Sequence, residues 1–228
     1  MYPCGMKVIL TILFITLSLN VFAQKGFYLK PTVGIGYGGR IHRAELSNIP
    51  MDNARGFSYK MLMMAGYGKK RWKFEAGLGY LSQKYGYNGL SLNLDPNVVS
   101  KSYANVRYTT NYITLPILAG YSIQVNNRLR FQPQIGLSLN YNMVTKARAE
   151  EFDMSGKKIG DVPGIDFKSK TFEIAGNVGL PLIYDLNKKL SIAAGPSFVG
   201  FLTQTKRLEL FKAIPYALML DAGLILKL

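Results

Sequence analysis

"LRFQPQIGLSLNYN", residues 129–142, is the stretch that decides the fold, because apolar and polar positions alternate along it. Successive side chains of a strand point to opposite faces, so a period of two predicts a strand with one oily face and one polar face. The oily set is Leu129, Phe131, Pro133, Ile135, Leu137, Leu139 and Tyr141, and it interleaves with Arg130, Gln132, Gln134, Gly136, Ser138, Asn140 and Asn142.

The same rhythm recurs along the chain. It is clear near residues 27–38 and 213–228, and weaker over 57–68, 72–85, 110–124, 171–185 and 190–203. Together with the first stretch, these segments predict eight strands. The connections alternate in length: the tight ones are 69–71, 125–128 and 186–189, and the long ones are 39–56, 86–109, 143–170 and 204–212. Short turns at one rim and long loops at the other are typical of outer-membrane barrels, with both termini on the periplasmic side.

Aromatic residues indicate which face is outside. Phe131 and Tyr141 are ten residues apart on the oily face, a rise of ~26 Å for a strand tilted by ~40°, close to the ~25 Å apolar band of such barrels. Phe27 and Tyr37 repeat the spacing, and Phe172 with Tyr184 and Tyr59 with Tyr67 come near it. Paired aromatic girdles favour a membrane barrel over a soluble, lipocalin-like barrel, which stays open as an alternative.

The sequence therefore predicts an all-β fold, a closed antiparallel up-and-down transmembrane β-barrel of about eight strands, in the cell outer membrane. The interior of such a barrel is just wide enough to be filled by side chains, so diffusive porin activity is not expected. The face predicted to line the lumen carries charges of both signs, which can pair across it: Lys30, Lys60, Lys73, Glu75, Lys84, Arg130, Glu173, Asp185, Asp221 and Lys227.

The N-terminus has the features of a secretory signal. Lys7 precedes an apolar run of about 12 residues, shorter than the ~20 that a spanning helix needs, and Val21-Phe22-Ala23 has the residue order of a cleavage site. We expect residues 1–23 to be a signal peptide and 24–228 to form the barrel domain. Translation can start at Met1 or Met6, and the sequence does not distinguish them.

The mature chain is strongly basic and has no thiol. The formal charge of the full chain is +15, and removing the leader takes away only Lys7, which leaves +14. Such a charge favours polyanionic neighbours. For an exported protein these are outer-membrane lipid and phosphorylated lipopolysaccharide, and no nucleic acid; simple solubility is the alternative. The one cysteine, Cys4, leaves with the leader, which excludes disulfides and thiolate chemistry. We expect a monomer with protein partners unknown.

A glycine-rich stretch at 34–39, GIGYGG, has the composition of a dinucleotide loop but not its context, because no helical pattern follows. We expect Gly34, Gly36 and Gly38 to face the lumen and make room for larger side chains. No cofactor-binding residue is predicted.

His42 is the only histidine of the chain, and Glu45, Ser47 and Asp52 lie near it. Such a set is ordinary loop composition, so it predicts neither a catalytic nor a metal site. Paired lumenal carboxylates (Glu75, Glu173, Asp221) are interpreted as counter-ions of lysine and arginine rather than as acid-base groups, because a buried charge needs a partner. The stretch 145–169, rich in both charges and in Gly and Pro, is expected to be a mobile extracellular loop.

One motif carries a resemblance to a known family. YITLPILAGY at 112–121, with the Phe22-Ala23-Gln24 junction and the glycine-rich first strand, is similar to the small outer-membrane barrels of Bacteroidota often called PorT-like. The resemblance covers most of the mature chain and implies an eight-stranded barrel in the outer membrane. The chain departs from many such barrels by ending in Leu228 instead of an aromatic residue.

The leading hypothesis is a non-enzymatic barrel with a structural or interaction role through its extracellular loops. An accessory part of an export or assembly machine is the first alternative, and the family name suggests it. A lipid-modifying barrel enzyme and a soluble ligand-binding barrel are the others. The specific role, any ligand or partner of the long loops and the oligomeric state are not written in the sequence.

We expect the mature protein to begin at Gln24, because Ala23 is the small residue that precedes the cut. N-terminal sequencing of the membrane-localised protein checks this. A sequence that begins at Met1 or Met6 would contradict it.

Overall fold

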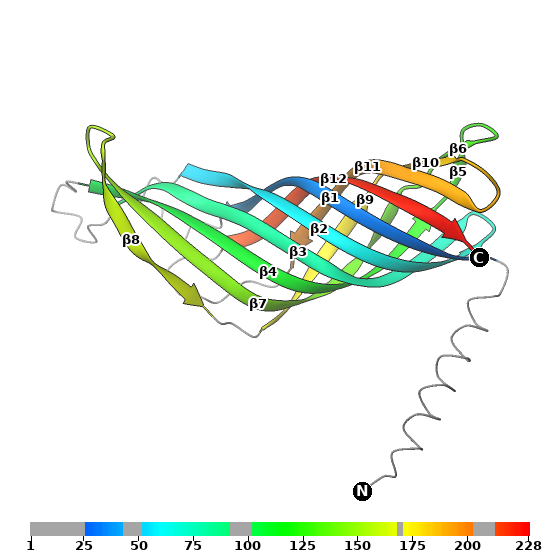
Figure 1. Cartoon of the computed structure of the whole chain (residues 1–228), viewed down its shortest axis with the longest axis horizontal. Helices are drawn as coiled ribbons and strands as arrows, with labels where there is room; N and C mark the ends of the chain where they lie inside the picture. The colour runs from blue at the N-terminus through cyan, green and yellow to red at the C-terminus, as the bar shows by residue number, and fades with distance from the viewer. Residues whose placement is uncertain (1–25, 43–51, 92–101, 168–170, 203–212) are drawn as a thin grey trace, which may run out of the picture.

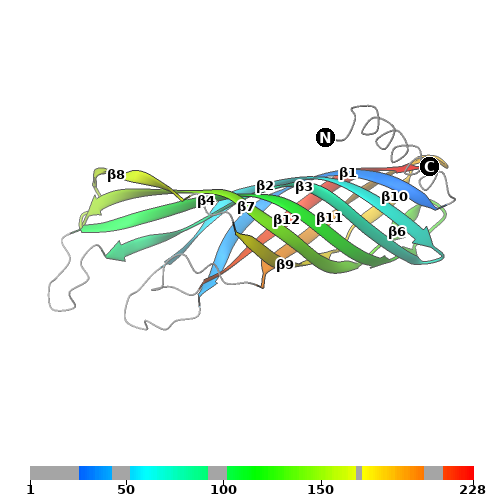
Figure 2. The ribbon, with the colours of Figure 1, turned by 90° about the horizontal axis from the view of Figure 1, so that it is seen from below.

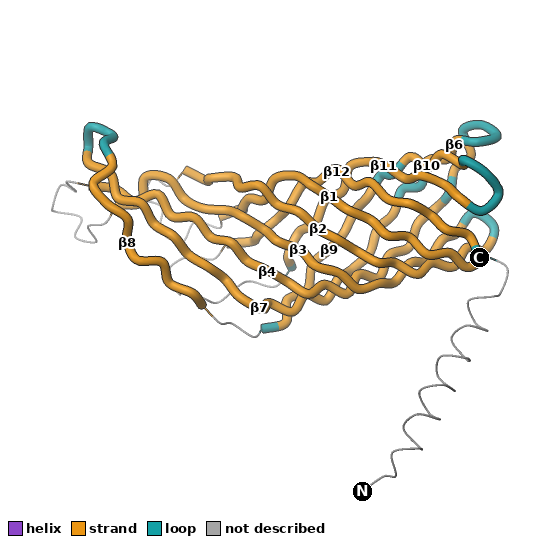
Figure 3. Tube along the Cα trace, in the orientation of Figure 1, coloured by secondary structure: helices purple, strands orange, loops and turns teal. Residues whose placement is uncertain are grey.

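A computed structural model describes residues 26–42, 52–91, 102–167, 171–202 and 213–228. The predicted signal peptide and the His42-flanking residues Glu45 and Ser47 lie outside this part of the chain. Within it, no helix is long and apolar enough to cross a bilayer. All its strands pair antiparallel in one sheet (Figures 1 and 3).

Eight of these strands close a ring, which confirms the predicted fold class. Their order is β12-β1-β2-β3-β4-β7-β9-β11, and β11 pairs back with β12. The remaining strands extend three members of the ring or, in the case of β8, pair with β7 alone. The bounds are β1 Phe27–His42, β2 Asp52–Lys69, β3 Trp72–Ser91, β4 Ser102–Tyr121, β5 Ile123–Gln124, β6 Leu129–Phe131, β7 Gln134–Asp153, β8 Lys158–Phe167, β9 Phe172–Gly179, β10 Leu182–Asp185, β11 Leu190–Phe201 and β12 Ala213–Lys227.

Two prolines explain why strands predicted as continuous are divided. Proline lacks the N–H that a ladder needs, and the breaks between β6 and β7 and between β9 and β10 lie at Pro133 and Pro181. The backbone stays paired through the breaks, because Tyr121 N donates to Pro133 O at 3.0 Å and Gln132 N donates to Pro181 O at 3.0 Å. The stretch 129–142 therefore belongs to one of the eight continuous segments of the ring, which we call staves. This stave consists of β6 followed by β7.

The oily face of each strand points outward. On β7, Ile135 is 66% exposed and Leu137 is 54% exposed, whereas Ser138 and Asn140 are buried in the lumen. An apolar outer surface around a polar interior is the reverse of a soluble barrel, so the lipocalin-like alternative is excluded. The belt includes Val33, Ile35, Met61, Met63, Leu78, Leu115, Ile117, Val178, Leu182, Leu218, Leu220 and Leu224.

Aromatic rings gather at both ends of this belt, as predicted. At the rim of short turns, Phe27 packs against Tyr67 with ring centroids 4.9 Å apart. At the other end, the rings of Tyr59 and Tyr80 are 5.9 Å apart and those of Tyr141 and Phe172 are 5.1 Å apart. The belt between the two girdles fits the hydrocarbon layer.

Both ends of the described chain lie at the short-turn rim, where Leu228 N donates to Phe27 O at 3.0 Å. The turn between β2 and β3 lies there too, since Gly68 N donates to Gly26 O at 2.9 Å. By the layout of outer-membrane barrels this rim is periplasmic and the opposite rim is extracellular.

The expectation of long loops at the extracellular rim was wrong for much of 86–109 and 143–170. Strand β3 continues to Ser91, β4 begins at Ser102, β7 runs to Asp153 and β8 returns beside β7, so the expected mobile loop at 145–169 is largely a hairpin. One reason is a bulge at Met143: Tyr112 pairs with Asn142 but Asn111 pairs with Val144, which shifts the alternation by one residue and hides the strand in the sequence.

The extensions lie on one side of the barrel. Figures 1 and 2 show β3, β4, β7 and β8 reaching well beyond the ends of β1, β9, β11 and β12. We call residues 84–91, 102–111 and 143–153 of these strands, with β8, the extracellular wall. A bilayer crossing needs ~9–11 residues per strand, so the 20 residues of β3, β4 and β7 far exceed it.

Substituting neighbours on β7 tests the assignment of faces. Ile135→Lys places a cation against lipid near mid-membrane, at a cost of ~2–4 kcal/mol, and we expect a low folded yield in lipid vesicles. Gln134→Lys places the same cation in the lumen, beside the cavity that Glu75 and Asp221 line, and should fold in higher yield. The opposite ranking of the two yields would mean that the faces are exchanged.

Candidate functional site

The lumen is held by ion pairs that reach between strands. Lys30 of β1 pairs with Glu75 of β3, and the Tyr28 hydroxyl donates to Glu75 Oε1 at 2.9 Å. Because the Glu75 side chain is only 1% exposed, its charge depends on these two donors. Glu75 is therefore a counter-ion, as predicted.

A second pair lies further along the lumen. Lys60 Nζ is 2.9 Å from Asp221 Oδ2 and donates to Ser197 Oγ at 3.0 Å, which ties β2 to β12 and β11. Gly34 lies beside it: a Cβ at Gly34 would overlap Asp221 Oδ1 and would be 2.8 Å from Lys60 Cε. The prediction that Gly34 makes room for lumenal side chains is confirmed, and Gly38 does the same beside Ser58.

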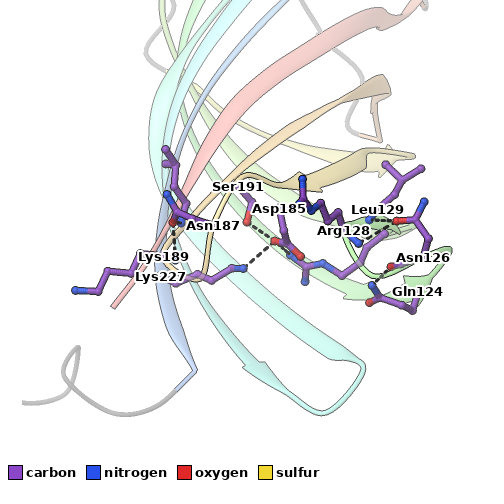
Figure 4. A network of polar contacts seen from close by, with 11 residues as sticks. Gln124, Asn126, Arg128, Leu129, Asp185, Asn187, Lys189, Ser191 and Lys227 are labelled. Atoms are coloured by element: carbon purple, nitrogen blue, oxygen red, sulfur yellow. Dashed lines mark hydrogen bonds and ion pairs between the residues drawn. The ribbon is translucent and has the colours of Figure 1, made fainter.

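The periplasmic end of the lumen is organised around Asp185 (Figure 4). Its Oδ1 accepts from Arg130 at 2.8 Å, from Lys227 at 2.7 Å and from the Ser191 hydroxyl at 2.5 Å. These donors come from β6, β12 and β11, so one carboxylate joins three staves where the ring ends.

The middle of the lumen is filled. A cluster of apolar side chains from five strands meets across it: Leu81, Tyr112, Ala175, Val199, Phe201, Ala217 and Met219. Tyr112 and Phe201, on β4 and β11, have ring centroids 5.0 Å apart, and Tyr112 also donates to Glu173 at 3.1 Å. A cavity lined by Lys30, Lys60, Glu75 and Asp221 has about 50 Å³, room for only a few waters at ~10–15 Å³ each. Such an interior favours a plugged barrel over a diffusive pore.

An aromatic cage encloses Arg40 at the extracellular end. The guanidinium carbon lies 3.8 Å from the ring centroid of Tyr85 and 5.3 Å from that of Tyr108, and Arg40 Nη1 donates to the Tyr87 hydroxyl at 3.0 Å. Sequence reasoning missed this group. The signal was available, since Arg40 continues the lumenal positions Gly34, Gly36 and Gly38, but the predicted strand ended at 38.

Lys84 was assigned to the lumen, and this was wrong: its side chain is exposed on the outer face. Glu75 and Lys84 are nine residues apart on β3, an odd number, so they cannot share a face of a regular strand.

The outer face of the wall is arranged in rows. One row is Lys84, Thr109 and Lys146, and the next is Gly86, Arg107 and Arg148. A third pairs Asn105 with Glu150. The wall therefore presents cations on the face that continues the lipid-facing surface.

The hairpin that ends the wall is held by Asp153. Its Oδ1 accepts from the Ser155 hydroxyl at 2.6 Å and from the backbone N–H groups of Ser155 and Lys157, each at 2.9 Å. The hydrogen bond from the Ser155 side chain and those from the backbone lower the pKa of Asp153. The carboxylate thus fixes the turn by an Asx-type pattern.

The structure describes only part of the stretch around His42 that the sequence analysis considered for catalysis or metal binding. His42 ends β1, but its side chain, like those of Glu45, Ser47 and Asp52, is outside what the structure describes. Across the described ranges, no group of three or more His, Cys, Asp or Glu residues could hold a metal ion.

A family model for an outer membrane protein beta-barrel domain matches residues 22–180. No curated protein sequence matches the chain.

Several solved structures resemble it at low identity. Neisserial surface protein A (NspA) is 14% identical, with a TM-score of 0.47 over 90% of this chain and 98% of that chain. Ail of Yersinia pestis, solved in complex with the heparin analogue sucrose octasulfate, is 11% identical, with a TM-score of 0.40 over 89% and 99%. The outer membrane protease OmpT of Escherichia coli is 9% identical, with a TM-score of 0.46 over 91% and 98%. At these scores none carries a functional argument.

Removing one partner of the Lys30–Glu75 pair tests its role. Glu75→Gln leaves the lysine buried without its counter-charge, and we expect a loss of about 3 kcal/mol in the free energy of unfolding. The double variant Lys30→Met with Glu75→Leu should recover much of that loss, because it removes both charges. Urea unfolding in lipid vesicles measures all three proteins. A Glu75→Gln midpoint equal to that of the wild type would show that the pair is not needed.

Proposed function

The chain belongs to the outer membrane protein beta-barrel domain family and lies in the cell outer membrane, and from this premise we propose that it is a non-enzymatic barrel with a structural or interaction role. Its acting surface is the extracellular rim, and above all the extracellular wall.

The length of the wall strands is the observation that carries this proposal. About 10 residues cross a bilayer, yet β3, β4 and β7 have 20 each and β8 adds a further strand. Water can satisfy the backbone beyond the membrane, so neither insertion nor closure requires this extra sheet. A paired sheet presents side chains more rigidly than a loop of the same length, which suits a surface for recognition.

The lumen supports a non-enzymatic role. Each of the carboxylates Glu75, Asp185 and Asp221 is engaged by a cation, and Glu75 and Asp185 also accept hydroxyl hydrogen bonds. Groups held in this way join neighbouring strands and stabilise the ring. Proton transfer to a substrate would require breaking those contacts.

A second candidate is an accessory component of an outer-membrane export or assembly machine. The motif at 112–121, which resembles the PorT-like barrels of Bacteroidota, favours it. The motif lies on β4, where Ile113, Leu115 and Ile117 face outward and Tyr112 reaches the lumenal cluster. Co-purification with secretion or periplasmic components would favour this candidate over the first.

A lipid-modifying enzyme is the remaining alternative, and it would use His42 as the general base. Two variants separate it from the main proposal in cells that lack the native gene. One is His42→Ala, and the other replaces residues 150–161 by Asn-Gly, a tight hairpin turn that keeps Ala149 paired with Val162.

We expect the His42→Ala protein to reverse fully the defect of the cells that lack the native gene. The protein with the shortened hairpin should reverse at most a tenth of that defect. Outer-membrane yield and the gel shift on heating serve as the folding control for both. The reverse result, with His42→Ala inactive and the shortened hairpin active, together with an altered lipid profile, would replace the proposal by the enzyme.

A further inference from the structure

The outer face of the wall changes character in steps away from the membrane. The extracellular aromatic row contains Tyr80, Ile113 and Tyr141, which are paired across β3, β4 and β7. The row of Lys84 and Lys146 is four residues further along β3 and the Arg107 row is six further along β4. At ~3.4 Å per residue and a ~40° tilt, these rows stand ~10 Å and ~16 Å beyond the girdle. That is the level of the headgroups, not of the acyl chains.

Arg107 and Arg148 stand directly opposite each other on neighbouring strands. Like charges at directly opposed positions destabilise a sheet. Arg107 Nη2 donates to Asn88 Oδ1 at 2.8 Å and Nη1 donates to Tyr87 O at 3.2 Å, and both acceptors are neutral. These contacts hold one guanidinium in place without compensating its charge.

The nearby acids are engaged elsewhere. Glu150 is diagonal to Arg107, but its Oε1 accepts from Lys158 at 2.8 Å, and Lys158 also reaches Asp161 at 2.6 Å. Both acids raise the pKa of Lys158, which keeps it charged and bound to them. Among the described residues, Lys84, Arg107 and Arg148 form no ion pair.

Among the described residues of the extracellular rim, the exposed cations lie on the wall and, with Arg55, on its neighbour β2. Where the strands opposite the wall leave the membrane, the described outward residues are apolar or aromatic: Tyr37, Phe172, Phe198 and Leu202. A cluster on one face, continuous with the lipid-facing belt, indicates a partner that lies beside the barrel in the plane of the membrane.

We propose that Arg107 and Arg148, with Lys84 and Lys146, bind the phosphate groups of lipid A in the outer leaflet. Guanidinium groups bind phosphate oxygens in a bidentate manner, and two on adjacent strands can share one phosphate. The bound phosphate removes the repulsion between the arginines. This inference rests on the proposed function in one respect, the placement of the wall outside the cell.

The test uses the purified mature protein in detergent micelles with bisphosphorylated lipid A, and with the same lipid after its phosphates are removed. Binding is measured by native mass spectrometry and by the shift of the thermal unfolding midpoint. The variant is Arg107→Gln with Arg148→Gln. The matched control is Lys188→Gln with Lys189→Gln, which removes two exposed cations from the periplasmic turn after β10.

We expect the wild type and the control to bind bisphosphorylated lipid A at least tenfold more tightly than the dephosphorylated lipid. The arginine variant should lose that tenfold preference. Without lipid A, its unfolding midpoint should be higher than that of the wild type, because a like-charge pair is gone. A residue with a merely structural role would not produce a rise without lipid together with a loss of the lipid-dependent shift.

Two results would overturn the inference: equal binding of the two lipids by the wild type, or equal loss of binding in the arginine variant and the control.

A separate experiment tests whether the wall lies outside the cell. Ser155→Cys on intact cells should react with a membrane-impermeant maleimide, and Asn187→Cys should not, since the only native cysteine, Cys4, precedes the predicted cleavage. Labelling of Ser155→Cys without selective lipid A binding would refute the inference alone. Failure to label it would refute the proposed function as well.

Discussion

Hydrogen-bond closure of the sheet is the constraint on which the rest of the structure depends. In hydrocarbon no water can satisfy a free N–H or C=O, so a sheet that crosses a membrane must have no edge. Here β12 pairs with β1 along thirteen positions and with β11 along eleven, which joins the first and last described strands and removes the edge. Closure then fixes two faces for every strand: lipid selects one and the lumen the other.

The size of the ring determines the chemistry of its interior. Eight strands leave space only for side chains, so charges that point inward are desolvated and must find partners within reach. Lys30 forms an ion pair with Glu75, and Lys60 forms one with Asp221. Asp185 forms ion pairs with both Arg130 and Lys227. These pairs specify which staves are neighbours across the lumen. The apolar cluster around Tyr112 and Phe201 contributes hydrophobic burial that a purely polar lumen would lack.

How much the sequence reveals depends on whether lipid or water faces each segment. Inside the membrane the alternation is strict, and it predicted the eight staves, the outward face of Ile135 and the counter-ion role of Glu75. The alternation did not predict two local features. Pro133 and Pro181 divide strands without ending the staves, and the bulge at Met143 exchanges the inward and outward positions of β7 beyond that residue. Beyond the membrane the outer face becomes polar, the period of two vanishes, and the wall was mistaken for loops. Arg40 was missed for the same reason.

The wall shows what happens where the constraint ends. Once the strands leave the hydrocarbon, water can satisfy an open edge, so closure is no longer required and individual staves can end at different heights. The extracellular end of β9 is Phe172, paired with Tyr141, whereas its neighbour β7 continues to Asp153 and pairs with β8 there instead. Nothing in membrane insertion demands that difference. Each residue ordered beyond the girdle costs conformational entropy, which lipid does not offset. The uneven ends therefore separate what the membrane imposes on this chain from what it does not, and the second part, the surface that we propose for recognition, is concentrated on β3, β4, β7 and β8.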